Sequence, residues 1–171
     1  MKANASLYNY SIKSYSTYLY AFLFIVGNIL LPQLAHLVPN GGPMLLPIYF
    51  FTLFAAYKYG LATGLLTAVF SPLVNSLLFG MPIPAFLPII LVKSVLLAVV
   101  AAFVAHRWRA VSIVSLIAVV LTYQIIGSLI EWVIVKDFFI AFQDFRIGIP
   151  GMLIQIVGGY LLLNIQVNKS K

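Results

Sequence analysis

Long apolar stretches, separated by short polar or proline- and glycine-rich breaks, run through the whole chain. The clearest of them lies at 59–84, YGLATGLLTAVFSPLVNSLLFGMPIP, which opens with small residues one helical turn apart and closes on an asparagine and two prolines. About twenty helical residues, at 1.5 Å each, cross the roughly 30 Å of a bilayer core. The pattern predicts six transmembrane helices, at about residues 15–37, 44–57, 61–78, 86–105, 111–135 and 148–167.

The breaks between these stretches carry residues that end helices. A Pro-Asn-Gly-Gly-Pro cluster at 39–43 separates the first two helices, and a turn at 58–60 separates the second from the third. Pro47 falls in the first turn of the second helix, where proline is tolerated, and Pro72 predicts a kink in the third. Residues 1–14 are polar and predict a short tail that continues into an interfacial helix.

Composition narrows the class of protein. Of the 171 residues, 63% are hydrophobic and 8% are charged, and the mean hydropathy is +1.09. A soluble domain needs a charged surface that this chain cannot form, so we expect an integral membrane protein. Continuous apolar runs indicate helices, because the strands of a membrane barrel alternate polar and apolar residues. We predict one all-α transmembrane domain over residues 1–171, without disulfides because the chain has no cysteine.

The distribution of basic residues predicts the orientation in the membrane. Six helices place both termini on one side, and cytoplasmic segments are enriched in Lys and Arg. Lys136 and Arg146 fall on the opposite side, and Lys93 lies within a helix. The tails and loops on the side of the termini hold the other seven of the ten basic residues, Lys2, Lys13, Lys58, Arg107, Arg109, Lys169 and Lys171. Both termini are therefore predicted to be cytoplasmic.

Large polar side chains gather in the half of each helix that this topology places outside. Such side chains are costly in hydrocarbon, so they face the bundle interior or a water-filled cavity. Five helices that contribute at a similar depth predict a substrate pocket open to the outside. The alternative is that these side chains hydrogen-bond to one another and hold the helices together. The candidate pocket residues are Asn28, Gln33, His36, Asn75, Lys93, Gln124, Glu131 and Gln155.

Lys93 and Glu131 allow two interpretations. They contact a carboxylate and a cationic or donor group of a ligand, or they neutralise each other as a buried ion pair between the fourth and fifth helices. Both interpretations hold if the pair opens toward a ligand. His36, close to Pro39, is more typical of a loop hydrogen bond than of a metal site, because the other histidine, His106, falls on the opposite side. No metal and no cofactor are predicted.

Segment 136–147 mixes charges with four phenylalanines spaced three and four residues apart. This spacing gives one apolar face, with Asp137, Asp144 and Arg146 available to the other face. The pattern predicts an amphipathic helix at the outer surface. It serves either as a lid over the pocket or as an interfacial anchor.

Small residues four positions apart let helices approach closely, and here they occur in the inner halves. Thr17 and Ala21 on the first helix and Gly60 and Gly64 on the third are candidates for docking another membrane protein. The alternative is packing within the bundle. The chain lacks the Gly-x-x-x-x-Gly-Lys-Ser/Thr, His-Glu-x-x-His and Gly-x-Ser-x-Gly motifs. We therefore predict that it is not an enzyme, and that any uphill transport is driven by a partner.

The run LLPIYFFTLFAAYKYGLATGLLTAVFSPLVNSLLFGMP, within 42–105, resembles the substrate-binding S components of energy-coupling factor (ECF) transporters, which import vitamins into bacteria. The resemblance lies in the proline that opens the second helix, the Tyr59-Gly60 turn, the Ser71-Pro72-Leu73 kink and the stretch 76–82. It implies a six-helix protein of the bacterial inner membrane. A vitamin-like substrate is then expected near the outer face, bound by helices four to six and the first loop.

The resemblance also implies partners: a transmembrane coupling subunit that carries two ATPase subunits. The family's Ala-x-x-x-Ala docking motif on the first helix has its nearest match here in Thr17-x-x-x-Ala21. The leading prediction is therefore capture of a vitamin-like molecule outside the cell for ATP-driven import, with no nucleic-acid partner. The alternatives are a membrane scaffold of the rod-shape-determining type, which has no use for outer polar residues, and a stand-alone secondary transporter, which usually needs more charged groups.

Overall fold

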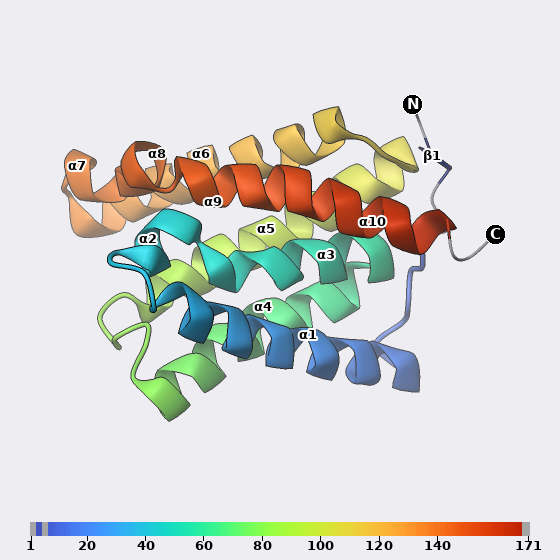
Figure 1. Cartoon of the computed structure of the whole chain (residues 1–171), viewed down its shortest axis with the longest axis horizontal. Coiled ribbons are helices and arrows are strands. Elements are labelled where there is room, and N and C mark those ends of the chain that lie inside the picture. The colour runs from blue at the N-terminus through green and yellow to red at the C-terminus, as the bar shows by residue number, and fades with distance from the viewer. Residues whose placement is uncertain (1–2, 5–6, 169–171) are drawn as a thin grey trace.

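Long helices lie side by side in alternating directions in the computed structural model, which describes residues 3–4 and 7–168 (Figure 1). Among these residues, four helices are long and apolar enough to cross a membrane: α1 (Tyr15–Ala35), α4 (Leu61–Phe79), α5 (Leu87–Trp108) and α6 (Ile113–Val135). Their 19 to 23 residues, at 1.5 Å each, span roughly 30 Å or more. The chain is a membrane protein, as its apolar pattern predicts.

The second predicted helix is divided in the structure. α2 (Gly41–Leu45) and the 3₁₀ turn η1 (Pro47–Tyr49) precede α3 (Phe50–Tyr59). Leu46, between α2 and η1, is left-handed with φ of 47°, and a residue before proline is disfavoured in the helical region. Every residue from 52 to 59 is buried, because α3 is mostly apolar and lies between α1, α4 and α5. Only ten residues of regular α-helix remain, so a second crossing here stays a prediction.

The sixth predicted helix is also interrupted. α9 (Ile149–Leu153) and α10 (Gly159–Asn168) flank the π-helical turn η2 (Ile154–Gly158). A π turn inserts an extra residue into the helical ladder and often accompanies functional sites. The apolar part of this run, Ile149–Ile165, is shorter than the four spanning helices. Its crossing of the membrane likewise stays a prediction.

Both ends of the described chain lie at one end of the bundle (Figure 1). β1 (Ala3–Asn4) pairs with β2 (Ala110–Val111) in an antiparallel ladder, and α10 ends beside them. α2, α7 (Phe138–Ala141) and α8 (Gln143–Ile147) lie at the opposite end. Which end faces the cytoplasm stays a prediction. Three of the basic residues behind that prediction, Lys2, Lys169 and Lys171, lie outside the described residues.

Residues 7–14 run across the turn between α3 and α4, so they are neither a free tail nor an interfacial helix. The Tyr8 amide donates to the Lys58 carbonyl at 2.8 Å, and the Tyr10 amide donates to the Tyr59 carbonyl at 3.2 Å. The Tyr8 and Tyr10 rings also stack near the Tyr59 ring, at centroid distances of 5.9 and 6.0 Å. This segment therefore covers the turn that joins the two helices.

The small residues predicted to dock a partner are covered by other parts of the same chain. A Cβ atom at Gly64 would lie 2.4 Å from the Cβ atom of Ala56 and 2.7 Å from its Cα atom, so α3 and α4 meet backbone to backbone. Gly60 ends α3 with φ of 95°, a conformation that favours glycine. Thr17 and Ala21 are 0% and 2% exposed. All four belong to contacts within this chain, which corrects the prediction that they present a free docking face.

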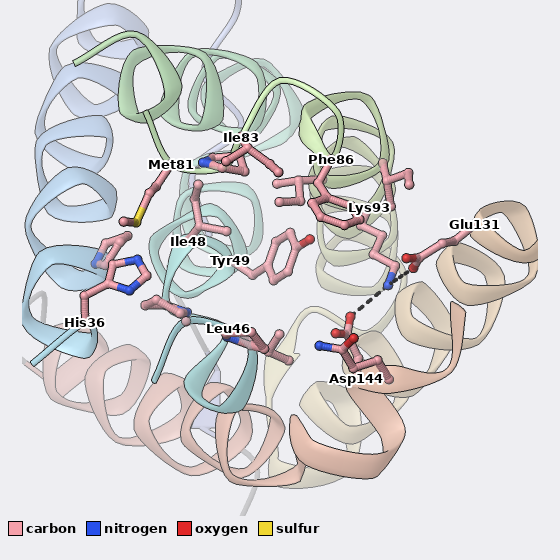
Figure 2. Close-up of a pocket in the computed structure, with 18 of the residues that line it drawn as sticks. His36, Leu46, Ile48, Tyr49, Met81, Ile83, Phe86, Lys93, Glu131 and Asp144 are labelled. Atoms are coloured by element: carbon pink, nitrogen blue, oxygen red, sulfur yellow. Dashed lines mark hydrogen bonds and ion pairs between the residues drawn. The ribbon is translucent and has the colours of Figure 1, made fainter. Parts of the chain in front are cut away.

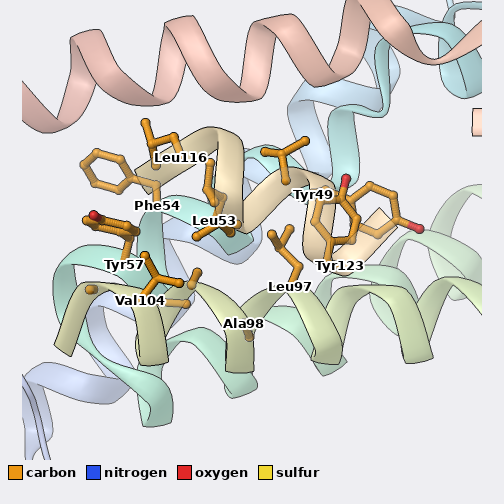
Figure 3. Close-up of a cluster of buried hydrophobic side chains, with 14 of the residues drawn as sticks. Tyr49, Leu53, Phe54, Tyr57, Leu97, Ala98, Val104, Leu116 and Tyr123 are labelled. Atoms are coloured by element: carbon orange, nitrogen blue, oxygen red, sulfur yellow. The ribbon is translucent and has the colours of Figure 1, made fainter. Parts of the chain in front are cut away.

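The core between α3, α5 and α6 consists of buried side chains (Figure 3). Leu53, Leu97 and Leu116 point toward one another and are each 0% exposed. The Tyr57 hydroxyl lies 2.8 Å from the Ala110 carbonyl oxygen and 2.7 Å from a serine hydroxyl of α6. In a bilayer, such packing and interhelical hydrogen bonding hold helices together. The core thereby fixes the two helices, α5 and α6, that carry a buried lysine and a buried glutamate.

Candidate functional site

A pocket of about 440 Å³ lies at the end of the bundle where α2, α7 and α8 are found (Figure 2). Its wall is formed by the end of α1, segment 42–49, the loop at 81–86, the first turns of α5, the end of α6 and the α7–α8 segment. Volumes of this size accommodate small organic molecules. The end of α6 and the α7–α8 segment form one side of this pocket. The interpretation of segment 136–147 as a lid therefore fits the geometry.

Most of the pocket wall is apolar. Ile48 comes from η1, while Ile83 and Phe86 come from the loop between α4 and α5. Ser76 ties this loop to α4, because its hydroxyl donates to the Pro82 carbonyl at 2.8 Å. The wall can therefore hold the ring or alkyl part of a ligand in a fixed place.

Three charged side chains meet at one side of the pocket (Figure 2). Lys93 Nζ lies 2.6 Å from Glu131 Oε2 and 2.8 Å from Asp144 Oδ2. The side chains come from α5, α6 and α8 and are 4%, 9% and 15% exposed. The ion-pair interpretation of Lys93 and Glu131 thus describes the structure. Both residues also line the pocket, so the pair remains within reach of a ligand.

A glycine on α6 makes room for the lysine. A Cβ atom at Gly127 would lie 2.8 Å from Lys93 Cγ, so a larger residue would displace the lysine stem. Gly127 lies one helical turn before Glu131, on the same face of α6. The ammonium group can therefore pass the helix backbone and reach the glutamate beyond it.

Asn28 and Asn75 lie in a separate polar network and do not line the pocket. The Asn28 amide donates to Thr52 Oγ1 at 3.0 Å and to Ser71 Oγ at 3.2 Å, and its oxygen accepts from the Phe51 amide at 3.1 Å. The Asn75 amide donates to the Asn28 carbonyl at 2.9 Å. These bonds join α1, α3 and α4, so Asn28 and Asn75 hold helices together, which is the alternative to a pocket role.

The three predicted glutamines lie outside the pocket wall as well. Gln33 is half-buried on α1. Gln124 is fully buried, and neither of its side-chain polar atoms has a hydrogen-bond partner among the described residues. Gln155 accepts from the Tyr123 hydroxyl at 2.9 Å and borders a second cavity of about 280 Å³. Of the eight predicted pocket residues, the structure brings three to the pocket: His36, Lys93 and Glu131.

Among the pocket residues that the sequence pattern does not predict, Asp144 and Tyr49 matter most for the chemistry of the site. Asp144 belongs to the charged face of segment 136–147, but the prediction gives that face no partner. The sequence does contain a signal for the pairing of Asp144 with Lys93. A lysine buried in a helix needs an anionic partner, and the chain has only three acidic residues. Tyr49 reaches the pocket because the left-handed Leu46 and the following Pro47 redirect the chain. No sequence pattern predicts that conformation.

The chemistry of the site is that of recognition: an apolar wall with a charged side. Within the described ranges, no three His, Cys, Asp or Glu side chains come together in a way that could hold a metal ion. His36 lies across the pocket from the charged side chains (Figure 2). In comparisons with protein-family models, with curated proteins and with solved structures, nothing matches the chain.

Proposed function

We propose that the chain is the substrate-capture subunit of an ECF-type importer in a bacterial cell membrane. The observation that carries the proposal is the pocket of about 440 Å³ at one end of a membrane-embedded helical bundle. It is mostly apolar and holds one cluster of charged groups, which is how sites for small molecules are commonly built. The resemblance of 42–105 to S components supports the same function.

The position of the pocket supports capture from outside the cell. It lies at the end opposite β1 and the end of α10, and the distribution of basic residues predicts that the end with β1 and α10 is cytoplasmic. The α7–α8 segment contributes Ile140, Gln143 and Asp144 to the wall. A short segment of this kind can move to admit a ligand while the spanning helices stay in place.

The energy for import comes from partner subunits in this proposal. The sequence contains no phosphate-binding loop, so ATP hydrolysis is assigned to two ATPase subunits joined through a transmembrane coupling subunit. Because Thr17, Ala21, Gly60 and Gly64 are covered within the chain, the coupling subunit must contact other, exposed surfaces.

Uptake in cells with and without the ATPase module tests this function. The probe is the molecule that co-purifies with the full-length chain, supplied in radiolabelled form. We expect accumulation against a gradient only when the chain, the coupling subunit and active ATPases are all present. Accumulation without any coupling ATPase would contradict the proposal and favour a stand-alone carrier. If uptake is unchanged in cells that lack this chain, the chain is not needed for import, and the membrane-scaffold function is favoured instead.

A further inference from the structure

The charged side of the pocket has an excess of negative charge. One ammonium, on Lys93, faces two carboxylates, on Glu131 and Asp144, so the formal sum over the three groups is −1. All three side chains are at most 15% exposed, so water screens them poorly. A net charge at a buried site is costly unless another group compensates it.

No other cation of the described chain compensates this charge at the pocket. Lys93 is the only Lys or Arg on the wall as the structure describes it. Arg146 follows closely after Asp144 but lies over the Phe139 ring, 5.9 Å from its centroid, and is exposed. His36 lies on the far side of the pocket (Figure 2). A cationic group of a ligand bound beside the two carboxylates would neutralise this excess charge.

The geometry also leaves acceptor capacity on the carboxylates. Each carboxylate oxygen has about two lone-pair sites, whereas Lys93 brings only three N–H groups to the cluster. Glu131 Oε2 lies 2.6 Å from Lys93 Nζ but receives no well-aligned hydrogen bond from the described residues. This oxygen is itself covered, so a ligand N–H group would bind at the remaining oxygens of Glu131 and Asp144, without breaking either ion pair.

The wall beside the charged cluster suits an aromatic body. Tyr49 and Phe86 line the pocket near Lys93 in the view of Figure 2. Aromatic faces attract cations as well as rings. Resting on the proposed capture function, we propose that the ligand is a small aromatic or heterocyclic molecule with a cationic or multiply N–H-bearing group, which binds at the carboxylates of Glu131 and Asp144.

An anionic ligand is the opposing possibility. A third carboxylate added to the cluster would bring its formal charge to −2. Otherwise the ligand must displace Asp144 from Lys93 and break the 2.8 Å contact that ties α8 to the wall. In that case Asp144 would occupy the place of the ligand's own carboxylate in the empty protein. A site for cationic ligands and a site for anionic ligands therefore predict opposite preferences for the charge of the ligand.

A matched pair of probes separates them: 2-(1-naphthyl)ethylammonium and 1-naphthylacetate, which share a ring system and differ in charge. Binding to the full-length protein, purified in neutral detergent at pH 7, is measured by isothermal titration calorimetry. We expect the ammonium probe to bind at least ten-fold more tightly than the carboxylate probe. In the double variant Glu131→Gln/Asp144→Asn, which keeps Lys93 positive, we expect the preference to reverse in favour of the carboxylate.

A reversed probe preference in the double variant cannot result from loss of folding, because an unfolded variant binds neither probe. Asp137→Asn is the matched control, since Asp137 is an exposed carboxylate that caps α7 and does not line the pocket. It should retain the original preference. Equal or tighter binding of 1-naphthylacetate by the unaltered protein, or no binding of either probe, overturns the inference. Neither result depends on ATPases, so failure of the proposed import is detected separately by the uptake assay.

Discussion

Lys93→Met is expected to lower the free energy of unfolding by about 3–5 kcal/mol, the usual cost of removing one partner of a buried ion pair. The substitution leaves Glu131 and Asp144 with no positive charge between them, at a site where their side chains are 9% and 15% exposed. It also releases α8 from α5, because the 2.8 Å contact between Lys93 and Asp144 is lost. The fall should be visible as a lower thermal unfolding midpoint in detergent.

Removing the two carboxylates as well should restore most of this loss. In Lys93→Met/Glu131→Gln/Asp144→Asn no charge remains buried, so the penalty for an uncompensated charge disappears. Lys13→Met serves as the control, because Lys13 is exposed in the segment before α1 and does not line the pocket, and it should leave the midpoint unchanged. If Lys93→Met were as stable as the unaltered protein, the three groups would not form the buried cluster described here.

Gly64→Leu is expected to destabilise the bundle by more than about 3 kcal/mol, above the usual cost of overpacking. A Cβ atom alone would lie 2.7 Å from the Cα atom of Ala56, and backbone cannot move aside as a side chain can. α3 would have to separate from α4, and α3 is the helix that α1, α4 and α5 surround. Ligand binding and uptake should therefore fail together.

The expected result for Gly64→Leu differs from that for a docking residue. At a docking face, a bulky residue abolishes uptake and leaves the ligand affinity of the isolated protein unchanged. Ala62→Leu, in the same turn of α4 but only half-buried, is the control that should keep the unfolding midpoint nearly constant. A stable Gly64→Leu variant that binds ligand normally and fails only in uptake would restore Gly64 to a docking role.

Apolar length is sufficient to predict the spanning helices. The sequence pattern places α1, α4, α5 and α6 to within three residues at each end, because twenty continuous apolar residues have few alternatives to a helix across a bilayer. The second predicted helix is divided in the structure, and the sixth, whose ends lie within one residue of the prediction, contains a π-helical turn. A left-handed Leu46 and a π-helical turn depend on tertiary packing, which leaves no local pattern in the sequence.

The candidate site is predicted only in part, for two physical reasons. Depth in the membrane says how far along a helix a polar residue lies, but not which neighbour it faces. Asn28 and Lys93 therefore look equivalent in sequence, although one joins helices and the other lines the pocket. Likewise, small residues four apart indicate close approach without indicating whether the partner is the same chain or another. For Gly64, the structure shows Ala56 of the same chain.

The claim that the pocket holds a small molecule is tested most directly by native mass spectrometry of the protein released from detergent. We expect the full-length chain to carry an additional mass, in a ratio near one per protein. Ile83→Trp, which fills the pocket from an exposed loop position, should lose that mass, whereas Leu77→Trp should keep it, because Leu77 is 84% exposed and lies outside the pocket wall. An unaltered protein that carries no additional mass even after incubation with cell extract, or an Ile83→Trp variant that carries as much as the unaltered protein, would contradict the account.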